Sequence, residues 1–179
     1  MRKILFILLF TPLVTFAQNE TNKPQTKFEQ LASKTGRILK FVDVKMPPRL
    51  SYLECNIRII MDEQLNRYFF RIEKPETPSS LEKIAMIEYS DLVEINKALK
   101  KLLSEVENDC ASNPDYLENK FITEDGFRIG YYVDNGKANW FIKIEPYGES
   151  TVFIKKEVLA EQFPAAQRKI EELKASYRK

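Results

Sequence analysis

The chain contains no histidine, only five glycines and a single tryptophan among its 179 residues. Without histidine it lacks the usual general base near neutral pH and the most common transition-metal ligand. The glycines are scattered, so the sequence has no glycine-rich loop of the kind that holds phosphate groups. We therefore expect no cofactor and no metal, and any catalysis would depend on carboxylates, lysine or tyrosine.

The chain also lacks any block of like charge. It has 28 basic and 26 acidic residues, a formal charge of +2. Two of the basic residues, Arg2 and Lys3, fall within the first seventeen residues, so residues 18–179 are formally neutral. Binding to a polyanion normally shows as a basic excess or a basic stripe. This balance argues against nucleic acid as a partner.

The first seventeen residues have the three parts of a secretory signal peptide. Arg2 and Lys3 form a basic start, residues 4–16 an apolar run, and residues 15–17 a small-x-small cleavage site. The apolar run is shorter than the roughly 20 residues that a membrane-spanning helix needs. We predict that residues 1–17 are cleaved; the alternative is a buried core helix.

The cleavage site also predicts where the protein works. No cysteine follows the site, so we expect no lipid anchor. The ending Phe16-Ala17-Gln18 resembles signal peptides of exported Bacteroidetes proteins. We expect an exported protein, periplasmic or extracellular, with no transmembrane segment in the mature chain.

Two cysteines, Cys55 and Cys110, remain in the mature chain. An even number of cysteines outside the reducing cytoplasm favours a disulfide. On the chain-entropy model such a bridge would add roughly 4 kcal/mol of stability. The alternative is a buried free thiol at Cys55, which lies in an apolar strand pattern.

Residues 18–30 are mostly polar and include a proline, which predicts a flexible tail before a single domain over residues 31–179. Within that domain the chain repeats itself. Residues 57–73 read IRIIMDEQLNRYFFRIE and residues 129–145 read IGYYVDNGKANWFIKIE. The boundary between the two repeats falls at about residue 110, so the first covers about 31–110 and the second about 111–179.

Each repeated segment reads as a β-hairpin rich in branched and aromatic residues. In the second copy, Asn135 and Gly136 suit the positive φ angles of a type I′ turn. Alternation along the strands then puts two sets of side chains on a core face. These are Tyr68, Phe70 and Ile72 in the first copy, and Trp140, Ile142 and Ile144 in the second.

Further strands are predicted at residues 37–46 and 83–87 in the first repeat, and at 116–123 and 150–154 in the second. Apolar residues at helical spacing follow in each, at residues 92–106 and 166–177. Pro164 suggests that the second helix starts near Phe163 or bends there. The fold class is therefore α+β, with two fused β-β-β-β-α repeats, pseudo-twofold symmetry and antiparallel sheets covered by helices.

This double order of four strands and a helix resembles the Whirly family of single-stranded DNA-binding proteins and, for each half, the PC4 coactivator domain. The resemblance covers residues 37–178 and concerns topology only, so it assigns no functional residue. It implies single-stranded nucleic-acid binding, against which the neutral charge and the predicted export both count.

The face of the hairpins opposite the core is the candidate binding surface. Aromatic and basic side chains alternate there and could stack on bases, sugars or aromatic groups. The alternative is structural, with cross-strand pairs or phenylalanines packed where the sheets meet. The candidate residues are Arg58, Phe69, Arg71, Arg128, Tyr132, Phe141 and Lys143.

The function predicted from these features is an exported, non-enzymatic binding module for a protein or glycan, of undetermined oligomeric state. One alternative is a hydrolase of envelope or environmental polymers that uses carboxylates such as the equivalent pair Glu73 and Glu145. The other is single-stranded nucleic-acid binding, by analogy with the fold.

Overall fold

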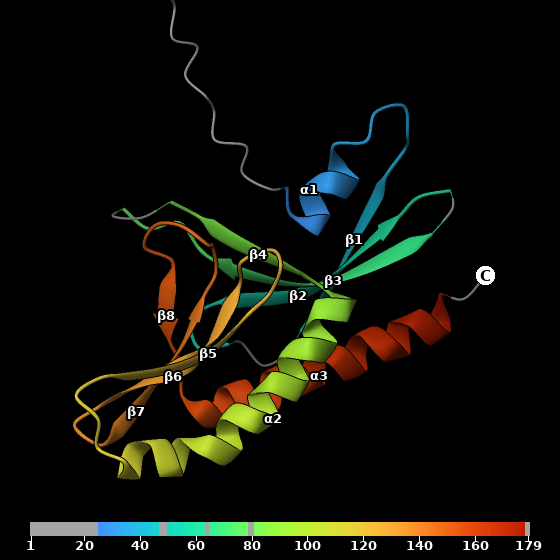
Figure 1. The fold of residues 1–179 in the computed structure, drawn as a ribbon. Helices are drawn as coiled ribbons and strands as arrows, with labels where there is room; N and C mark the ends of the chain where they lie inside the picture. The colour runs from blue at the N-terminus through green and yellow to red at the C-terminus, as the bar shows by residue number, and fades with distance from the viewer. Residues whose placement is uncertain (1–24, 47–49, 64, 79–80, 178–179) are drawn as a thin grey trace, which may run out of the picture.

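A computed structural model describes residues 25–46, 50–63, 65–78 and 81–177. It contains two four-stranded antiparallel sheets, each followed along the chain by a long helix (Figure 1). The predicted α+β class and the double order of four strands and a helix are therefore confirmed. The predicted signal peptide, residues 1–17, lies outside the described residues.

The first sheet is a simple meander in which each strand pairs with the next, in the order β1-β2-β3-β4. Residues of β3 that were predicted to face the core do so: Tyr68, Phe70 and Ile72 are all buried in one hydrophobic cluster. The elements of this repeat are β1 (Lys40–Lys45), β2 (Glu54–Met61), β3 (Asn66–Lys74), β4 (Lys83–Glu88) and α2 (Tyr89–Ala111).

The second sheet repeats the meander as β5-β6-β7-β8. The predicted turn is confirmed, since Asn135 and Gly136 have φ angles of 49° and 69°. Trp140, Ile142 and Ile144 are buried in the same core cluster as their counterparts. The elements are β5 (Leu117–Ile122), β6 (Arg128–Asp134), β7 (Lys137–Lys143), β8 (Thr151–Phe153) and α3 (Lys156–Ser176).

The two long helices lie side by side and connect the repeats (Figure 1). Helix α3 packs on β2 and β3 of the first sheet rather than on the sheet of its own repeat. Helix α2 packs on both sheets, on β3 and β4 of its own repeat and on β5, β6 and β7 of the second. Phe163 of α3 illustrates this, because its ring meets Phe70 edge-on at 5.5 Å between centroids. In addition, Asn96 of α2 donates to the carbonyl of Phe163 at 3.2 Å. The halves therefore share one core.

Helix α3 begins earlier than the sequence predicted, at Lys156 rather than near Phe163, and Pro164 lies inside it. Proline removes one backbone donor from a helix interior. The burial of Leu159, Phe163 and Ala166 along one face explains why the helix nonetheless continues. In the described part of the chain, no helix is long and apolar enough to cross a membrane.

A short helix, α1 (Lys27–Ala32), precedes the first sheet and overlaps the predicted polar tail. Its start is fixed by a capping box, in which Glu29 N–H donates to Thr26 Oγ1 at 3.1 Å and Thr26 N–H donates to Glu29 Oε2 at 2.7 Å. The ring of Phe28 meets Phe69 of β3 edge-on at 6.0 Å. The structure therefore differs from the prediction here, because residues 27–30 pack on the outer face of the first sheet.

The predicted disulfide is wrong, since Cys55 and Cys110 are both free. Cys55 is buried in β2 of the first sheet, opposite Ile72. Cys110 lies in the last turn of α2, which packs on the second sheet. Because α2 extends from the first sheet to the second, its last turn places Cys110 in a different part of the core from Cys55.

Candidate functional site

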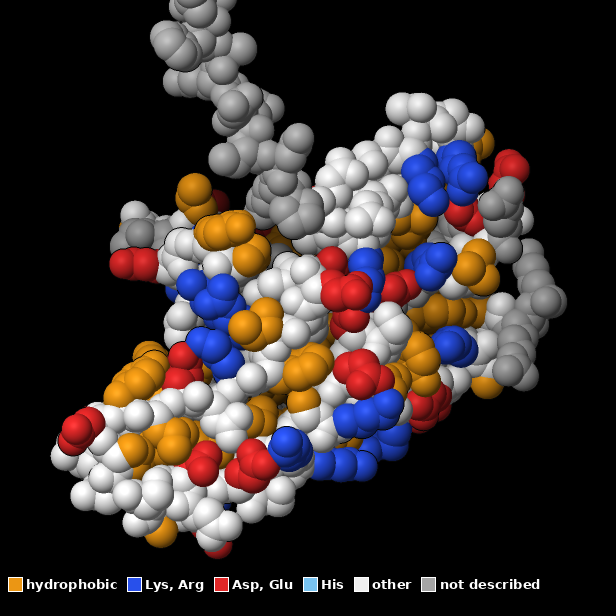
Figure 2. Space-filling model, viewed as in Figure 1, with side chains coloured by type: hydrophobic (Ala, Val, Ile, Leu, Met, Phe, Trp, Pro, Cys, Tyr) orange, Lys and Arg blue, Asp and Glu red, His pale blue; other side chains and the backbone are white. Residues whose placement is uncertain are grey.

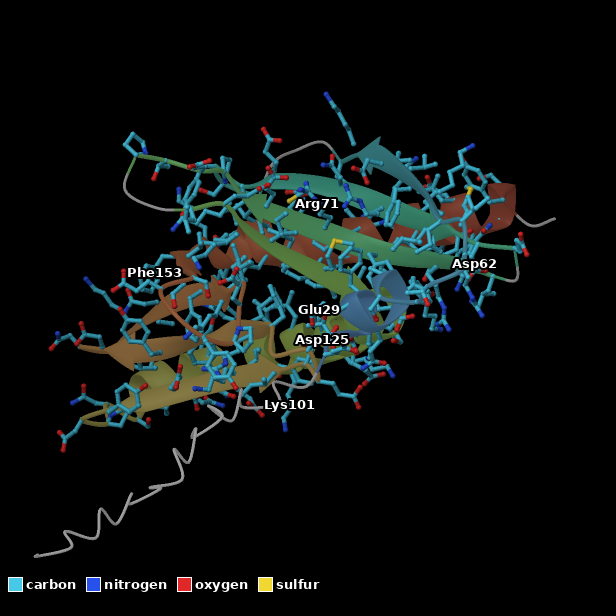
Figure 3. The ribbon with its side chains drawn as sticks, turned by 90° about the horizontal axis from the view of Figure 1, so that it is seen from above. Glu29, Asp62, Arg71, Lys101, Asp125 and Phe153 are labelled. Carbon is cyan, nitrogen blue, oxygen red and sulfur yellow. The ribbon has the colours of Figure 1, made fainter. Side chains whose placement is uncertain are left out.

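In the first repeat, the predicted aromatic and basic residues are occupied by internal contacts. Phe69 is 1% exposed beneath Phe28 of α1. Arg58 donates from two nitrogens to both carboxylate oxygens of Asp43, at 2.7 and 2.6 Å. Arg71, which is labelled in Figure 3, is buried. It forms an ion pair with Glu73. This face of the first sheet therefore offers little open surface.

The equivalent face of the second sheet is more open, because residues 112–116 lead straight into β5 without a helix like α1. Figure 2 shows hydrophobic side chains gathered over this sheet, at the lower left. Of the predicted residues here, Arg128, Tyr132 and Lys143 are half-buried. Arg128 donates to the carbonyl of Pro146 at 3.5 Å.

Phe141 is the exception on this face, since it is only 5% exposed. It pairs across the strands with Gly130, where a Cβ atom would come within 2.2 Å of the carbonyl oxygen of Asn119. The glycine is thus required by the close approach of β5. Phe141 has a packing role, whereas Tyr132 lies at the margin of a groove.

The groove lies where β8 stops short. β8 pairs only with residues 141–143 of β7, and one further bond joins Ile154 N–H to the carbonyl of Trp140 at 3.1 Å. Beyond it, residues 137–139 of β7 border a groove of about 920 Å³. We call this the β7-edge groove. Its walls include Val106 and Cys110 of α2, Trp140, Tyr132, Phe153 and the first residues of α3.

The backbone of Ala138 forms an unpaired strand edge in this groove. Hydrogen-bonding groups alternate in direction along a strand, so those of Ala138 point the same way as the carbonyl of Trp140, towards β8. Within the described ranges, the N–H and C=O of Ala138 make no backbone hydrogen bond. An unpaired edge of this kind is a template on which another strand can add.

Aromatic rings flank this edge on the outer side. Phe153 is 59% exposed, and its ring meets Tyr132 edge-on at 6.1 Å. On the inner side Trp140 is buried against Tyr131 at 4.7 Å between ring centroids, and its indole nitrogen has no hydrogen-bond partner among the described residues. The groove can therefore contact apolar side chains on both sides of an added strand.

One end of the groove is positive. Lys137, Lys155 and Lys156 line it and, in the part of the chain that the structure describes, none of them forms an ion pair. Lys155 and Lys156 lie at the start of α3, whose N-terminus adds the positive end of a helix dipole. Glu107 and Glu157 also line the groove, so the excess of positive charge is small.

Two polar side chains of the second sheet, Tyr131 and Asn119, hold α2, which forms one wall of the groove. Tyr131 is fully buried and donates from its hydroxyl to Asp109 of α2 at 2.6 Å. Burial raises the pKa of the Tyr131 phenol, and the hydrogen bond to Asp109 raises it further. Asn119 of β5 donates to Asp109 at 3.3 Å and to Glu105 at 2.9 Å. These contacts hold the last turns of α2 against the second sheet.

Of the candidate binding residues predicted from the sequence, only Tyr132 lines this groove. The sequence did not identify Phe153, which stands next to Tyr132 only because β8 pairs beside β7. The sequence also did not identify Ala138, because Ala138 contributes its backbone N–H and C=O, which the pattern of side chains does not reveal. The capping-box pattern of Thr26 and Glu29 was a readable signal for α1.

Comparison of this chain with models of protein families, with curated proteins and with solved structures finds no match in any of the three. The β7-edge groove itself is therefore the basis of the proposed function.

Proposed function

We propose that this chain is an exported, non-enzymatic interaction module whose β7-edge groove binds an extended peptide segment of another protein. The observation that carries the proposal is the unpaired backbone of Ala138 beside a groove of about 920 Å³. In strand addition, main-chain hydrogen bonds supply affinity and alternate side-chain pockets supply specificity.

The peptide we propose carries apolar side chains on both faces and acidic residues at one end. Alternate side chains of an added strand would lie towards Phe153 on one side and towards Val106 and Cys110 on the other. An acidic end near Lys155 and Lys156 would face two unpaired ammonium groups and the N-terminus of α3. We favour a peptide over a glycan because a glycan would leave the strand edge unpaired.

The other two functions have less support. The carboxylates of a hydrolase, Glu73 and Glu145, are each neutralised by a neighbouring cation, Arg71 for Glu73 and Lys83 for Glu145. Charged pairs of this kind are common at strand ends without any catalytic role. Nucleic-acid binding would draw on the groove lysines, but the nearby glutamates Glu107 and Glu157 offset most of their charge.

The symmetry of the fold is part of the proposal. We propose that the two repeats are related by a pseudo-twofold axis in the manner of the Whirly family. The repeated sequence and the identical strand orders β1-β2-β3-β4 and β5-β6-β7-β8 support it. Export to the periplasm or beyond rests on residues 1–17 alone.

The single tryptophan of the chain provides the test of peptide binding, because Trp140 lines the groove. The probe is a short synthetic peptide that alternates valine and threonine and ends in aspartates. We expect it to change the Trp140 emission saturably. The same peptide with an N-methyl group on every residue has no N–H to donate along either edge and should leave the emission unchanged. Binding that is equal for both peptides, or no change up to about 1 mM, contradicts the proposal.

A variant pair locates the binding on the strand edge. Ala138→Pro removes the N–H, and since that N–H is unpaired, the exchange breaks no hydrogen bond of the sheet. We expect it to weaken peptide binding about tenfold, or 1.4 kcal/mol. The control Ala138→Ser keeps the N–H and should bind as the parent chain does. Equal peptide affinity of both variants would mean that the strand edge is not used. If two copies of the chain pair through the groove instead, sedimentation of the parent chain would show a dimer.

A further inference from the structure

The outer face of the second sheet carries two cations side by side. Arg128 of β6 and Lys143 of β7 are directly opposite each other in the sheet, and both are half-buried. Their side chains point away from the core, because Ile129 and Ile142 beside them point into it. Opposite residues of this kind have Cβ atoms about 5 Å apart, and like charges there destabilise the pairing. We call Arg128 and Lys143 the basic pair.

No carboxylate neutralises the basic pair in the part of the chain that the structure describes. Arg128 makes one long contact, a donation to the carbonyl of Pro146 at 3.5 Å. Lys143 forms no ion pair and no side-chain hydrogen bond with the described residues. Glu118 points to the same face, but it is opposite Tyr132, about 13 Å along β6 from Arg128, and is paired with a lysine of its own strand. The positive charge of the pair therefore remains available.

The first repeat has the same positions but a different charge balance. Lys143 corresponds to Arg71 in the repeated segments, and Glu145 corresponds to Glu73. In the first sheet, Glu73 forms an ion pair with Arg71. In the second sheet, Glu145 instead contacts Lys83 of β4 at 2.6 Å, so the cation of β7 loses its internal partner. The fold itself therefore does not require an unpaired cation here, and a partner with negative charge complements it.

Exposed apolar side chains flank the basic pair. Ile122 of β5 is directly opposite Arg128 and is 48% exposed. Phe153 of β8, labelled in Figure 3, is opposite Phe141, the next outward residue of β7, and is 59% exposed. The face thus has a cationic centre with an apolar side chain on either side. Such a face fits an acidic group carried on an apolar surface.

The first sheet also indicates the shape of the partner. Its outer face is covered by a helix, α1, whose Phe28 packs edge-on against Phe69, the counterpart of Phe141. The corresponding segment of the second repeat, residues 112–116, contains no helix. At the basic pair, β6 and β7 are hydrogen-bonded to strands on both sides, so this face offers no backbone for an added strand. A helix lying across the face is the element that fits.

We infer that the outer face of the second sheet docks an acidic amphipathic helix of a partner protein. A carboxylate of that helix lies between Arg128 and Lys143, and its apolar side chains contact Ile122 and Phe153. A guanidinium and an ammonium group can together donate to both oxygens of one carboxylate. We favour a protein over nucleic acid because two cations do not form a basic stripe. The inference does not depend on strand addition in the β7-edge groove.

The test uses the full mature chain labelled with ¹⁵N and two synthetic helical peptides, one with glutamates and leucines on one face and one with glutamine in place of each glutamate. We expect the acidic peptide to shift the amide signals of Arg128, Lys143 and Thr151 saturably, and the glutamine peptide to bind at least tenfold more weakly. Added salt should weaken the acidic peptide. Equal binding of both peptides overturns the inference. So do shifts centred on Ala138 in the groove, or tighter binding of a single-stranded oligonucleotide.

A matched set of variants assigns the binding to the basic pair. Lys143→Gln should weaken binding of the acidic peptide at least tenfold. Lys100→Gln removes the same charge from an exposed position of α2 and should bind as the parent chain does. Lys143→Glu places opposite charges across the strands, so it should abolish binding and raise Tm, a combination that a purely structural lysine would not give. Unchanged affinity in Lys143→Gln overturns the inference. If a variant fails to fold, the comparison of the two peptides on the parent chain still decides the question.

Discussion

Tyr131→Phe removes one hydroxyl from the contact that holds α2 on the second sheet. Tyr131 is fully buried and its hydroxyl donates to Asp109 at 2.6 Å. A hydrogen bond to a charged group contributes about 1.5–3 kcal/mol. Because Asp109 keeps a bond from Asn119 at 3.3 Å, we expect a loss near the lower end, about 1.5–2 kcal/mol. For a chain of this size that lowers Tm by about 3–8 °C.

The assay is urea and thermal unfolding of the variant beside a control at the next position. Tyr132→Phe removes the same hydroxyl from a half-buried ring, for which the structure gives no hydrogen bond in the described residues. We expect the control to change stability by less than about 0.5 kcal/mol. The denaturant slope should be equal in both variants, since neither changes the area exposed on unfolding. A Tyr131→Phe variant as stable as Tyr132→Phe would refute the reasoning.

The same hydroxyl predicts a pH dependence. The pKa of Tyr131 is raised in the folded protein, by burial first and then by Asp109. The folded state therefore retains a proton that the unfolded state loses above its pKa of about 10. Stability is complete below that pH and falls as the pH rises towards the folded pKa. Tyr131→Phe should lose less stability between about pH 10 and 11 than the parent chain does. An identical alkaline fall in both would show that Tyr131 does not titrate as described.

Two further predictions concern the cysteines and α1. Since both thiols are free, the denatured protein should titrate with two thiols without prior reduction. In the native protein Cys110 should react first, because burial raises the pKa of Cys55 to about 11. Fewer than two thiols would indicate a disulfide after all. Phe28→Ala removes the edge-on contact with Phe69, worth about 0.5–1.5 kcal/mol beyond the lost burial. Amide exchange in α1 should accelerate while α2 stays protected, and unchanged exchange in α1 would count against its docking through Phe28.

The sequence predicted well what local pattern controls. Alternation identified the core faces of β3 and β7, because one face of each sheet is buried and the register therefore decides which side chains point inward. Asn135 and Gly136 identified a turn because few residues accept its backbone angles. The predicted start of the last helix near Phe163 was wrong, because Pro164 lies inside an α3 that begins at Lys156.

What failed depended on contacts between distant parts of the chain. The disulfide was predicted from the even number of cysteines and the predicted export of the protein. Neither says where α2 places Cys110 relative to Cys55. The packing of α3 on the first sheet and of α2 on both sheets is equally invisible, since an apolar helix stripe fits either sheet. A cavity of about 250 Å³ likewise gathers Asp91 and Asp125 from elements that only the packed halves bring together.

The packing of α3 on the first sheet also sets the order in which the chain can complete its fold. The first sheet, β1 to β4, is finished by residue 88, yet α3, which covers this sheet together with α2, is the last element of the chain. Until residues 156–176 are present, the inner side chains of that sheet, such as Phe70, lack the contact with Phe163 that covers them. We therefore expect that no N-terminal half folds early on its own, and that the chain acquires its core only as a whole.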